Sequence, residues 1–573
     1  MAPLSNDPLH FPQEALHGLV QANSDYLQSV HGGVVRATES PQDEVAVVVG
    51  GGSGHYPAFA GWVGPGLAHG AACGNIFSSP SASQVYSVAR AAHNGAGVVL
   101  NFGNYAGDVL HFGLAAERLR AEGVDVRIVT VTDDIASNSA DKHEERRGIA
   151  GDLVVCKVLS AAAAEGCDLD TVEQLGRRAN ARTRTLGVAF AGCTAPGADQ
   201  PLFTVPEGAM AIGLGVHGEP GIDEKSLGSA SEVADLLLDG VLAEEPDRGQ
   251  DGYDGQVAVL LNGLGATKYE ELFVVYARVA ERLAEHGLDI VQPEVGEHVT
   301  SLDMAGLSLT LTYLDDDLAR LWTAPAASPA YRRGVVDDDA PAKVLEERSE
   351  SETIDEGAPA SQELATAATD ALRRVASVLA EQEDHLGRLD SVAGDGDHGQ
   401  GMVLGSSAAL KSAESACDQG VGARTLFIRA GDAWSEGAGG TSGALWGAAL
   451  TAVGGVLSDD EGATPQHAVE AVDRAEQTIL RLGGAKEGDK TLVDALAPFA
   501  RTLREQADGG SLAQAWQQAA DAAHEAADQT AELKATLGRA RTHGDKSVGT
   551  PDPGAISLAM VVTEIAAVLT EQS

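Results

Sequence analysis

The sequence predicts an α/β half followed by an all-α half. From about residue 44 to residue 314, short runs rich in β-branched residues alternate with longer helical stretches. Between about 331 and 361 the apolar periodicity disappears and acidic residues dominate. From residue 362 onward, Ala- and Leu-rich helical stretches follow and strand signals almost vanish. Continuous apolar strands separated by helices are typical of α/β layers buried on both faces, whereas the later pattern favours a helical bundle or helical barrel.

Six apolar runs are the predicted strands of the first half, which spans 1–330. An amphipathic helix over 268–286, closed by Gly287, follows the fifth run. Glycines and a proline cluster over 185–200, where we expect the break between two α/β subdomains. The runs are Val45–Val49, Val98–Phe102, Val126–Val131, Ala209–Val216, Val257–Leu261 and Leu307–Leu314.

The acidic stretch over 331–361 cannot bury enough apolar area to order itself, so we expect a flexible linker. The second domain then spans 362–573. Its predicted helices are Glu363–Leu386, Leu404–Ser415, Gly443–Val456, Ala468–Leu482 and Leu512–Ala527.

Composition and charge exclude several classes of protein. A chain of 573 residues is too long for one core. Its net charge of −45 repels phosphate backbones and anionic headgroups, so nucleic acid and membranes are not expected partners. Five widely spaced cysteines, with no Cys-x-x-Cys pair, indicate free thiols. The N-terminus has no export signal and the chain has no apolar run of 18 residues, so we expect a soluble cytoplasmic protein.

One histidine, His217, lies between glycines in Gly-Leu-Gly-Val-His-Gly-Glu-Pro-Gly over 213–221, at the end of a predicted strand. An imidazole presented in this way can reach a small electrophile, although it can also merely cap a turn. Two further motifs follow apolar strands: Gly-Gly-Gly-Ser-Gly-His over 50–55 and Asn-Tyr-Ala-Gly-Asp over 104–108. Strand ends of an open sheet converge on one crevice, so we expect His55, Asp108 and His217 to share a pocket.

The glycines over 50–54 do not form a P-loop, because His55-Tyr56-Pro57 follows instead of Lys-Ser or Lys-Thr. They form either a structural tight turn or a cup that lets a very small ligand approach the backbone, with His55 placed for proton transfer. Asp108 has a structural alternative too, as the N-cap of a helix beginning at Val109.

The second half contains an acidic loop with Asp390, Asp395 and Asp397 separated by glycines. Three carboxylates at this spacing suit Mg²⁺, although a solvated acidic turn is the alternative. Gly-Gly-Thr-Ser-Gly over 439–443 and Asp-Pro-Gly-Ala over 552–555 each open an apolar helix, and Arg539 and Arg541 lie shortly before the second. Helix starts attract anions, so the set predicts a nucleotide platform.

In this order, the motifs resemble those of the ATP-dependent dihydroxyacetone kinase family over nearly the whole chain, including Arg-Gly-Ile-Ala-Gly over 147–151. The resemblance implies a ketose-binding half of two α/β subdomains joined to an eight-helix barrel that binds ATP and two Mg²⁺ ions. It also implies a homodimer. A phosphotransferase-system version of the family uses separate subunits, and fusion in one chain favours exchangeable ATP instead.

The resemblance also implies residue roles. His217 attacks the C2 carbonyl and holds the ketose as a hemiaminal, His55 exchanges protons with the C2 oxygen, and Asp108 accepts the proton of the terminal hydroxyl. Gly52 and Ser53 line the substrate cup, and Asp390, Asp395 and Asp397 hold the metals. The implied nucleotide contacts are Gly399, Gln400, Gly401, Met402, Thr441, Ser442, Arg539, Asp552, Pro553 and Gly554.

Two positions depart from the family's usual pattern. Tyr56 stands where Glu is common, and Gly103 where Lys is common. The lost lysine leaves space for a ketose one carbon longer than dihydroxyacetone, and the pattern is similar to that of the erythrulose kinase branch. We therefore expect D-erythrulose, phosphorylated to D-erythrulose 4-phosphate, with dihydroxyacetone as the alternative substrate. A ketose-binding sensor without turnover is the alternative class, and an FAD-cyclising side activity stays open.

Overall fold

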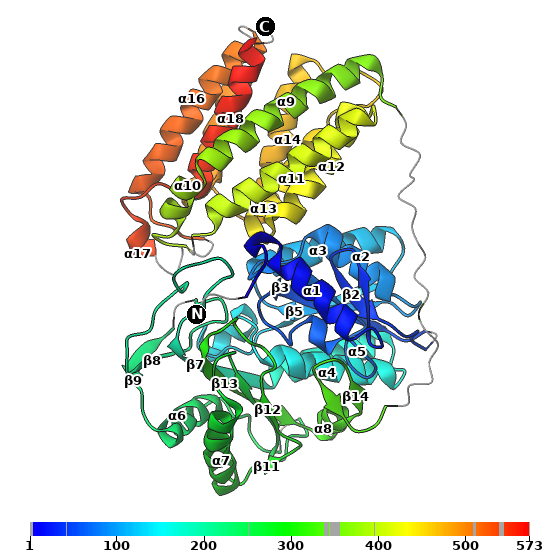
Figure 1. The fold of residues 1–573 in the computed structure, drawn as a ribbon, viewed down its shortest axis with the longest axis vertical. Helices are drawn as coiled ribbons and strands as arrows, with labels where there is room; N and C mark the ends of the chain where they lie inside the picture. Colours follow the sequence, from blue (N-terminus) through cyan, green and yellow to red (C-terminus); the bar gives the residue numbers. More distant parts are fainter. Residues whose placement is uncertain are drawn as a thin grey trace. The chain divides into compact units, whose positions relative to one another are not determined.

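The computed structural model describes residues 4–41, 43–219, 221–249, 251–336, 343, 356–394, 396–507, 511–537 and 544–571. The chain divides into two compact units, Met1–Glu346 and Glu347–Ser573, which are described separately (Figure 1). Most of the expected linker over 331–361 lies outside the described residues.

The first unit contains two large sheets. The first sheet has the order β1-β2-β4-β3-β5-β6, and β3 runs parallel to β4 and β5. Its strands are β1 (Leu27–Val30), β2 (Gly33–Arg36), β3 (Ala46–Ser53), β4 (Gly70–Ile76), β5 (Val98–Gly103) and β6 (Val126–Val131).

The second sheet has the order β11-β10-β13-β7-β8-β9, with β12 also paired to β10. Here β13 is antiparallel to β10 and β7. The strands are β7 (Thr183–Ala191), β8 (Ala209–Ile212), β9 (Asp223–Ser226), β10 (Gln256–Gly263), β11 (Asp289–Ile290), β12 (Glu294–Gly296) and β13 (Ala305–Leu314), and a separate pair is β14 (Ala326–Ala327) with β15 (Arg332–Arg333). All six predicted strands are thus present.

The expected break over 185–200 is misplaced. Its first residues belong to β7, a strand of the second sheet, so the division between the sheets lies before Thr183. Gly187 suggested a loop, but it lies within β7, where its backbone faces β13. The predicted strand over 209–216 also ends early, at Ile212, because Gly213 adopts a φ of +73° and turns the chain.

Helices cover both sheets in layers, as Figure 1 shows. The layer of α2 and α3 packs on one face of the first sheet, and α4 and α5 pack on the other. Alternate residues of β3 face these two layers, which explains its continuous apolar sequence. The helices α6 and α7 pack on the second sheet. The bounds are α1 (Phe11–Ala22), α2 (Ala82–Ala92), α3 (Ala106–Ala121), α4 (Gly151–Ala164), α5 (Leu169–Ala181), α6 (Ala230–Leu242), α7 (Tyr269–Glu285) and α8 (Asp316–Thr323).

The described residues of the second unit form helices and connecting turns without strands. Each long helix packs on the next, and the last one, α18, packs on both α16 and the first one, α9. The bounds are α9 (Pro359–Glu381), α10 (Glu383–Asp390), α11 (His398–Asp418), α12 (Ala423–Ala438), α13 (Gly440–Gly454), α14 (Pro465–Gly483), α15 (Val493–Gln506), α16 (Leu512–Gln529), α17 (Gly544–Ser547) and α18 (Pro553–Glu571).

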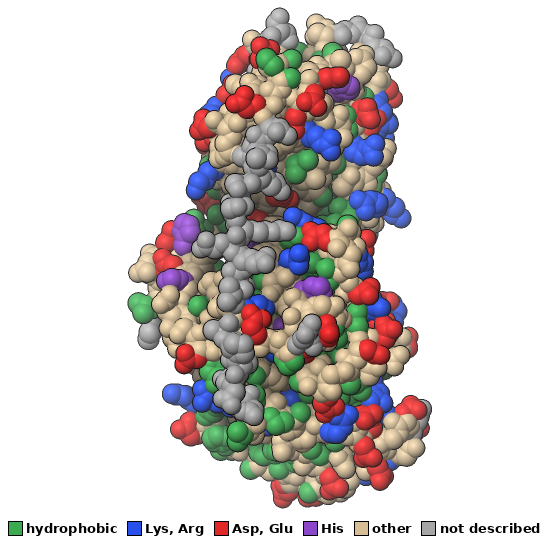
Figure 2. All heavy atoms as spheres, turned by 90° about the vertical axis from the view of Figure 1, so that its right-hand side faces the viewer, with side chains coloured by type: hydrophobic (Ala, Val, Ile, Leu, Met, Phe, Trp, Pro, Cys, Tyr) green, Lys and Arg blue, Asp and Glu red, His purple; other side chains and the backbone are tan. Residues whose placement is uncertain are grey.

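The surface and one helix bear on the expectations about membranes. Acidic side chains are spread over the face in Figure 2 and are interspersed with Lys and Arg. Within the described residues, α18 is the one helix long and apolar enough to cross a membrane by length and composition. A core helix of a soluble protein passes the same test, and α18 contributes nine buried residues to its unit.

Candidate active site

A pocket in the first unit brings His55, Asp108 and His217 together, as the strand-end argument predicts. His55 follows β3, Asp108 lies in the first turn of α3 after β5, and His217 follows β8. The lining residues are Gly50, Gly51, Gly52, His55, Phe59, Gly103, Tyr105, Asp108, Gly148, Ile149, Asp152, Val216, His217 and Val299.

The glycines of β3 allow neighbouring groups to approach the backbone closely. A Cβ added at Gly51 would lie 2.5 Å from the Phe59 ring, and one added at Gly52 would lie 2.7 Å from the backbone nitrogen of Ser78. Ser53, expected to line the cup, instead donates its hydroxyl to the Gly74 carbonyl at 2.6 Å. Gly52 and Gly103 lie in the pocket wall.

His217 is held by a carboxylate two residues later in the chain. Its Nδ1 lies 2.9 Å from Oε1 of Glu219, and its backbone N–H donates to Oε2 at 3.0 Å. Arg147 lies 3.9 Å from the same carboxylate and also donates to Asp134 at 3.0 Å. Although burial opposes it, the attraction of His217 and Arg147 lowers the pKa of Glu219 well below its usual range. Glu219 is therefore a fixed negative charge beside the imidazole.

The two histidines contact each other through their Nε2 atoms, which lie 3.0 Å apart. Nδ1 of His55 lies 2.7 Å from the Thr300 carbonyl oxygen, which only accepts, so this Nδ1 carries a hydrogen. Nδ1 of His217 carries a hydrogen for the same reason, because its partner is the Glu219 carboxylate. Each ring in its neutral form would then have a lone pair at Nε2. A hydrogen bond between them requires one additional proton, which the charge of Glu219 balances.

Burial, followed by repulsion from His217, lowers the pKa of His55 to about 3. His55 therefore holds an extra proton weakly and gives it up readily. Aromatic rings enclose the pair: the Phe77 ring stacks on His55 at 5.0 Å between centroids, and the Tyr105 ring meets His217 edge-on at 4.8 Å.

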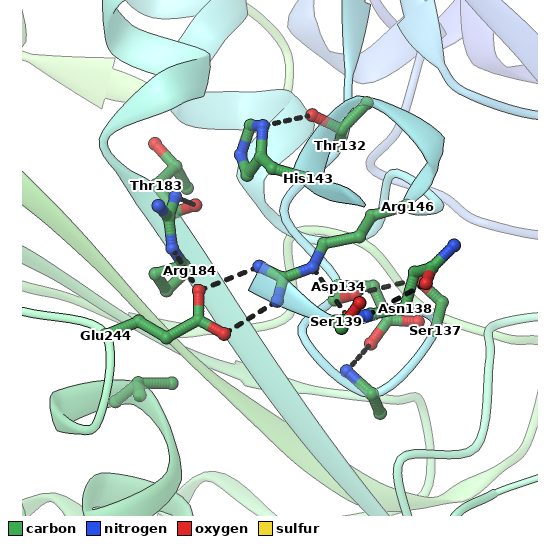
Figure 3. A network of polar contacts seen from close by, with 12 residues as sticks. Thr132, Asp134, Ser137, Asn138, Ser139, His143, Arg146, Thr183, Arg184 and Glu244 are labelled. Atoms are coloured by element: carbon green, nitrogen blue, oxygen red, sulfur yellow. Dashed lines mark hydrogen bonds and ion pairs between the residues drawn. The ribbon is translucent and has the colours of Figure 1, made fainter. Parts of the chain in front are cut away.

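A buried clamp fixes the loop that carries Arg147 (Figure 3). The guanidinium of Arg146 is 1% exposed and donates to both oxygens of Glu244, at 2.9 and 2.6 Å. Arg184 of β7 donates to the same carboxylate at 2.7 Å. Glu244, which follows α6, holds Arg146 in place. The next residue in the chain, Arg147, is therefore directed towards Asp134 and Glu219.

Asp108 is buried, and it accepts a hydrogen bond from the Ser79 hydroxyl at 2.7 Å. The alternative interpretation as an N-cap is wrong, because α3 begins at Ala106 and its N-cap residue is Tyr105. The carboxylate therefore projects from the first turn of the helix into the pocket wall.

The acidic loop of the second unit is described in part, since Asp395 lies outside the described residues. Asp390 accepts hydrogen bonds from the backbone of Gly396 and His398. Burial and repulsion from Asp390 raise the pKa of Asp397 to about 7. Burial also raises the pKa of Asp552 to about 7, with Asp390 contributing. Within the described residues no cluster of three His, Cys, Asp or Glu has metal-site spacing, but this mutual repulsion fits a divalent cation.

Starts of three helices meet in the second unit. His398, the first residue of α11, bonds Ser557 of α18 at 2.9 Å. Asp552 caps α18 by accepting from the Ala555 N–H at 2.8 Å. Lys490, just before α15, is buried and donates to four carbonyls, those of Thr530, Leu533, Ser547 and Thr550, at 2.6 to 3.1 Å.

The predicted nucleotide contacts fall into three groups. Thr441 and Ser442 are exposed in the first turn of α13, as an anion site requires, and Pro553 and Gly554 lie in the first turn of α18. Met402 is buried in the helical core, and a Cβ at Gly399 would lie 2.1 Å from the Glu383 carbonyl oxygen, so these two residues contribute to helix packing. Gln400 and Gly401 lie in the first turn of α11, as Gly399 does. Arg539 and Arg541 lie outside the described residues.

Sequence reasoning missed two residues that line the first unit's pocket, Tyr105 and Asp152. It also missed Glu219, which contacts His217, and Arg147, which lies beside Glu219. Each lies in or beside a motif that the sequence singled out. The signal for Glu219 was its place two residues after His217. Arg147 contacts Asp134 and Glu219, and Asp152 shares the pocket with Gly103 and Asp108. Because these neighbours come from distant segments, no local signal identified either residue.

Comparisons with known proteins agree with this arrangement. Residues 17–330 match the Dak1 domain, and residues 392–567 match the DAK2 domain. The chain is 59% identical over 572 residues to the L-erythrulose 1-kinase of Mycolicibacterium smegmatis, with 100% of each chain covered. It is 52% identical over 576 residues to the D-erythrulose kinase of the same organism, covering 99% of this chain and 98% of the relative.

A solved structure matches the chain over the length of both units. It is the dihydroxyacetone kinase from C. freundii in complex with AMP-PNP and Mg²⁺, which is 31% identical with a TM-score of 0.52 and 99% of each chain covered.

Proposed function

The chain belongs to the dihydroxyacetone kinase family, and on this premise we propose that it is an ATP- and Mg²⁺-dependent kinase of erythrulose, a four-carbon ketose. The observation that supports this most directly is the His55–His217 pair with its balancing Glu219, set in a glycine-walled pocket. Such a site suits capture of a small carbonyl compound. We also infer that the ring of helices is an eight-helix barrel, that the protein is a cytoplasmic homodimer, and that 1–330 and 362–573 are its two domains.

The enantiomer and the phosphorylated position need separate consideration. The sequence predicts D-erythrulose and phosphorylation at position 4. The relative at 59% identity is named for the L enantiomer and for position 1, whereas the relative at 52% is named for the D enantiomer. We therefore propose L-erythrulose as the first candidate substrate. D-erythrulose, which the sequence predicts, is the second candidate.

The proton count of the histidine pair gives a balanced capture step. Because the pKa of His55 is lowered, capture proceeds from the minor form of the pair in which Nε2 of His55 carries the additional proton. In that form the lone pair on Nε2 of His217 attacks C2. A C–N bond forms, the π electrons of the carbonyl move to oxygen, and His55 gives its proton to that oxygen. The product is a hemiaminal with a positively charged His217 ring, whose Nδ1–H faces Glu219, and a neutral His55.

Asp108 then acts as general base for the terminal hydroxyl of the captured ketose. It accepts the hydroxyl proton as the oxygen attacks the γ-phosphate, and Ser79 keeps the carboxylate oriented. Asp390, Asp395 and Asp397 would hold Mg²⁺, which neutralises charge on the triphosphate. The starts of α13 and α18 bind the nucleotide.

A substrate panel tests the proposal. The protein is incubated with ATP, Mg²⁺ and either L-erythrulose, D-erythrulose or dihydroxyacetone, and ADP release gives kcat/KM for each. We expect kcat/KM to be higher for erythrulose than for dihydroxyacetone. Phosphorus NMR of the product, with carbon coupling, assigns position 1 or 4. Absence of ADP release with every ketose would instead support the sensor, and a clear preference for dihydroxyacetone would refute the choice of erythrulose.

A further inference from the structure

We propose that Asp152 is the specificity-determining residue that forms a hydrogen bond with the hydroxyl group on the additional carbon of a four-carbon ketose. The inference rests on the proposed function, and it assigns a role to a side chain that the capture and transfer steps do not use.

Asp152 lies in the first turn of α4 and lines the same pocket as His55, Asp108 and His217. It is 5% exposed. Its Oδ1 is buried and has no hydrogen-bond partner in the described part of the chain. A buried carboxyl oxygen without a partner costs free energy, and this cost is removed when a ligand hydroxyl supplies the partner.

The unpartnered oxygen lies close to Gly148, whose backbone packs against that of Gly103. A Cβ added at Gly148 would lie 2.6 Å from Cα of Gly103 and 3.2 Å from Oδ1 of Asp152. The two glycine backbones and the carboxyl group therefore meet at one wall of the pocket. A ketose that extends one carbon towards this wall, which Gly103, Gly148 and Asp152 line together, would bring its hydroxyl to Asp152.

The carboxyl group is rigidly placed. Asp133 accepts the backbone N–H groups of Ile149 and Gly151, each at 2.8 Å, and so fixes the turn that begins α4. Burial, with repulsion from Asp133 and Asp108, raises the pKa of Asp152 well above its usual range. A neutral carboxyl group both donates and accepts hydrogen bonds, as a hydroxyl group does. Because it carries no charge, it also does not repel the carboxylate of Asp108.

The experiment compares kcat/KM for erythrulose and dihydroxyacetone in the full-length protein. Asp152→Leu keeps the approximate size but removes both polar atoms, and we expect erythrulose to lose about 10- to 100-fold while dihydroxyacetone changes less than about threefold. Asp152→Asn retains a donor and an acceptor, so its preference should stay within about fivefold of wild type. Asp316→Leu, an exposed acid in the first turn of α8, is the matched control and should change neither substrate.

The outcomes separate the roles. A fall in kcat/KM for erythrulose alone supports recognition of the additional hydroxyl group by Asp152. An equal fall in both substrates would show a structural or proton-transfer role and overturn the inference, as would an unchanged ratio. If Asp152→Leu does not fold, Asp152→Ala is judged by the same ratio. If the wild-type protein turns over no ketose, the proposed function is overturned together with the role of Asp152. If the wild type is active and only the expected change in the Asp152 variants is missing, the inference about Asp152 alone is overturned.

Discussion

Replacing Glu219 with glutamine tests the charge balance on which ketose capture depends. In the wild type the two carboxylate oxygens each accept one hydrogen bond from His217, at 2.9 Å from Nδ1 and at 3.0 Å from the backbone nitrogen. Glutamine offers one acceptor oxygen, so one of these donors is left facing an NH₂ group. The substitution also removes the negative charge that faces the positively charged hemiaminal ring.

The loss can be sized from these contacts. A hydrogen bond to a charged group contributes about 1.5–3 kcal/mol, which corresponds to a decrease of roughly 10- to 150-fold in kcat/KM for the ketose. The assay is steady-state ADP release at varied erythrulose and saturating ATP, with KM for ATP measured in parallel. The effect should appear in kcat/KM for the ketose and leave KM for ATP within about threefold.

The matched control is Glu224→Gln on β9, where the residue is exposed. It should retain wild-type kinetics. A Glu219→Gln variant that also keeps its kcat/KM within about threefold of wild type would refute the proton count on the histidine pair.

Three further substitutions, at Asp108, Glu244 and His69, have expected outcomes. Asp108→Asn should lower kcat by about 10²- to 10⁴-fold with the ketose adduct still detectable by intact mass, and an unchanged kcat removes its role as base. Glu244→Gln breaks the buried pair with Arg146 and should lower the free energy of unfolding by about 3 kcal/mol in urea titration; a loss under about 0.5 kcal/mol contradicts the clamp. Burial lowers the pKa of His69 to about 4, so the unfolded chain binds the proton first and stability falls as pH drops from about 6.5 to 4. His69→Gln should flatten this slope by up to about 1.4 kcal/mol per pH unit, and equal slopes in the two proteins would rule this out.

Much of the fold could be predicted because its strands are continuous apolar runs. Strands without that composition were missed: β4 reads Gly-Ala-Ala-Cys-Gly-Asn-Ile, and β9 consists of four exposed polar residues. Both depend on their neighbours in the sheet. The break between the sheets was misplaced because Gly187, a typical loop residue, lies inside β7.

The candidate site divides in the same way. Short motifs located His55, Asp108 and His217, because strand ends of an open sheet meet at one edge. The groups that tune them could not be predicted, since their pairing depends on tertiary structure. Arg147 reaches Glu219 from a segment 72 positions earlier in the sequence, and the oxygen of Asp152 is recognised as unpartnered only when its surroundings are known.

Four backbone carbonyl oxygens surround the ammonium group of Lys490, in the way that carbonyl oxygens surround a bound potassium ion in other proteins. A bound ion exchanges with the medium, and its occupancy follows the salt concentration. A cation tethered to the backbone does neither. The junction of α15, α16 and α18 therefore keeps its internal counter-charge when the surrounding electrolyte changes, so its shape should be insensitive to the choice of monovalent salt.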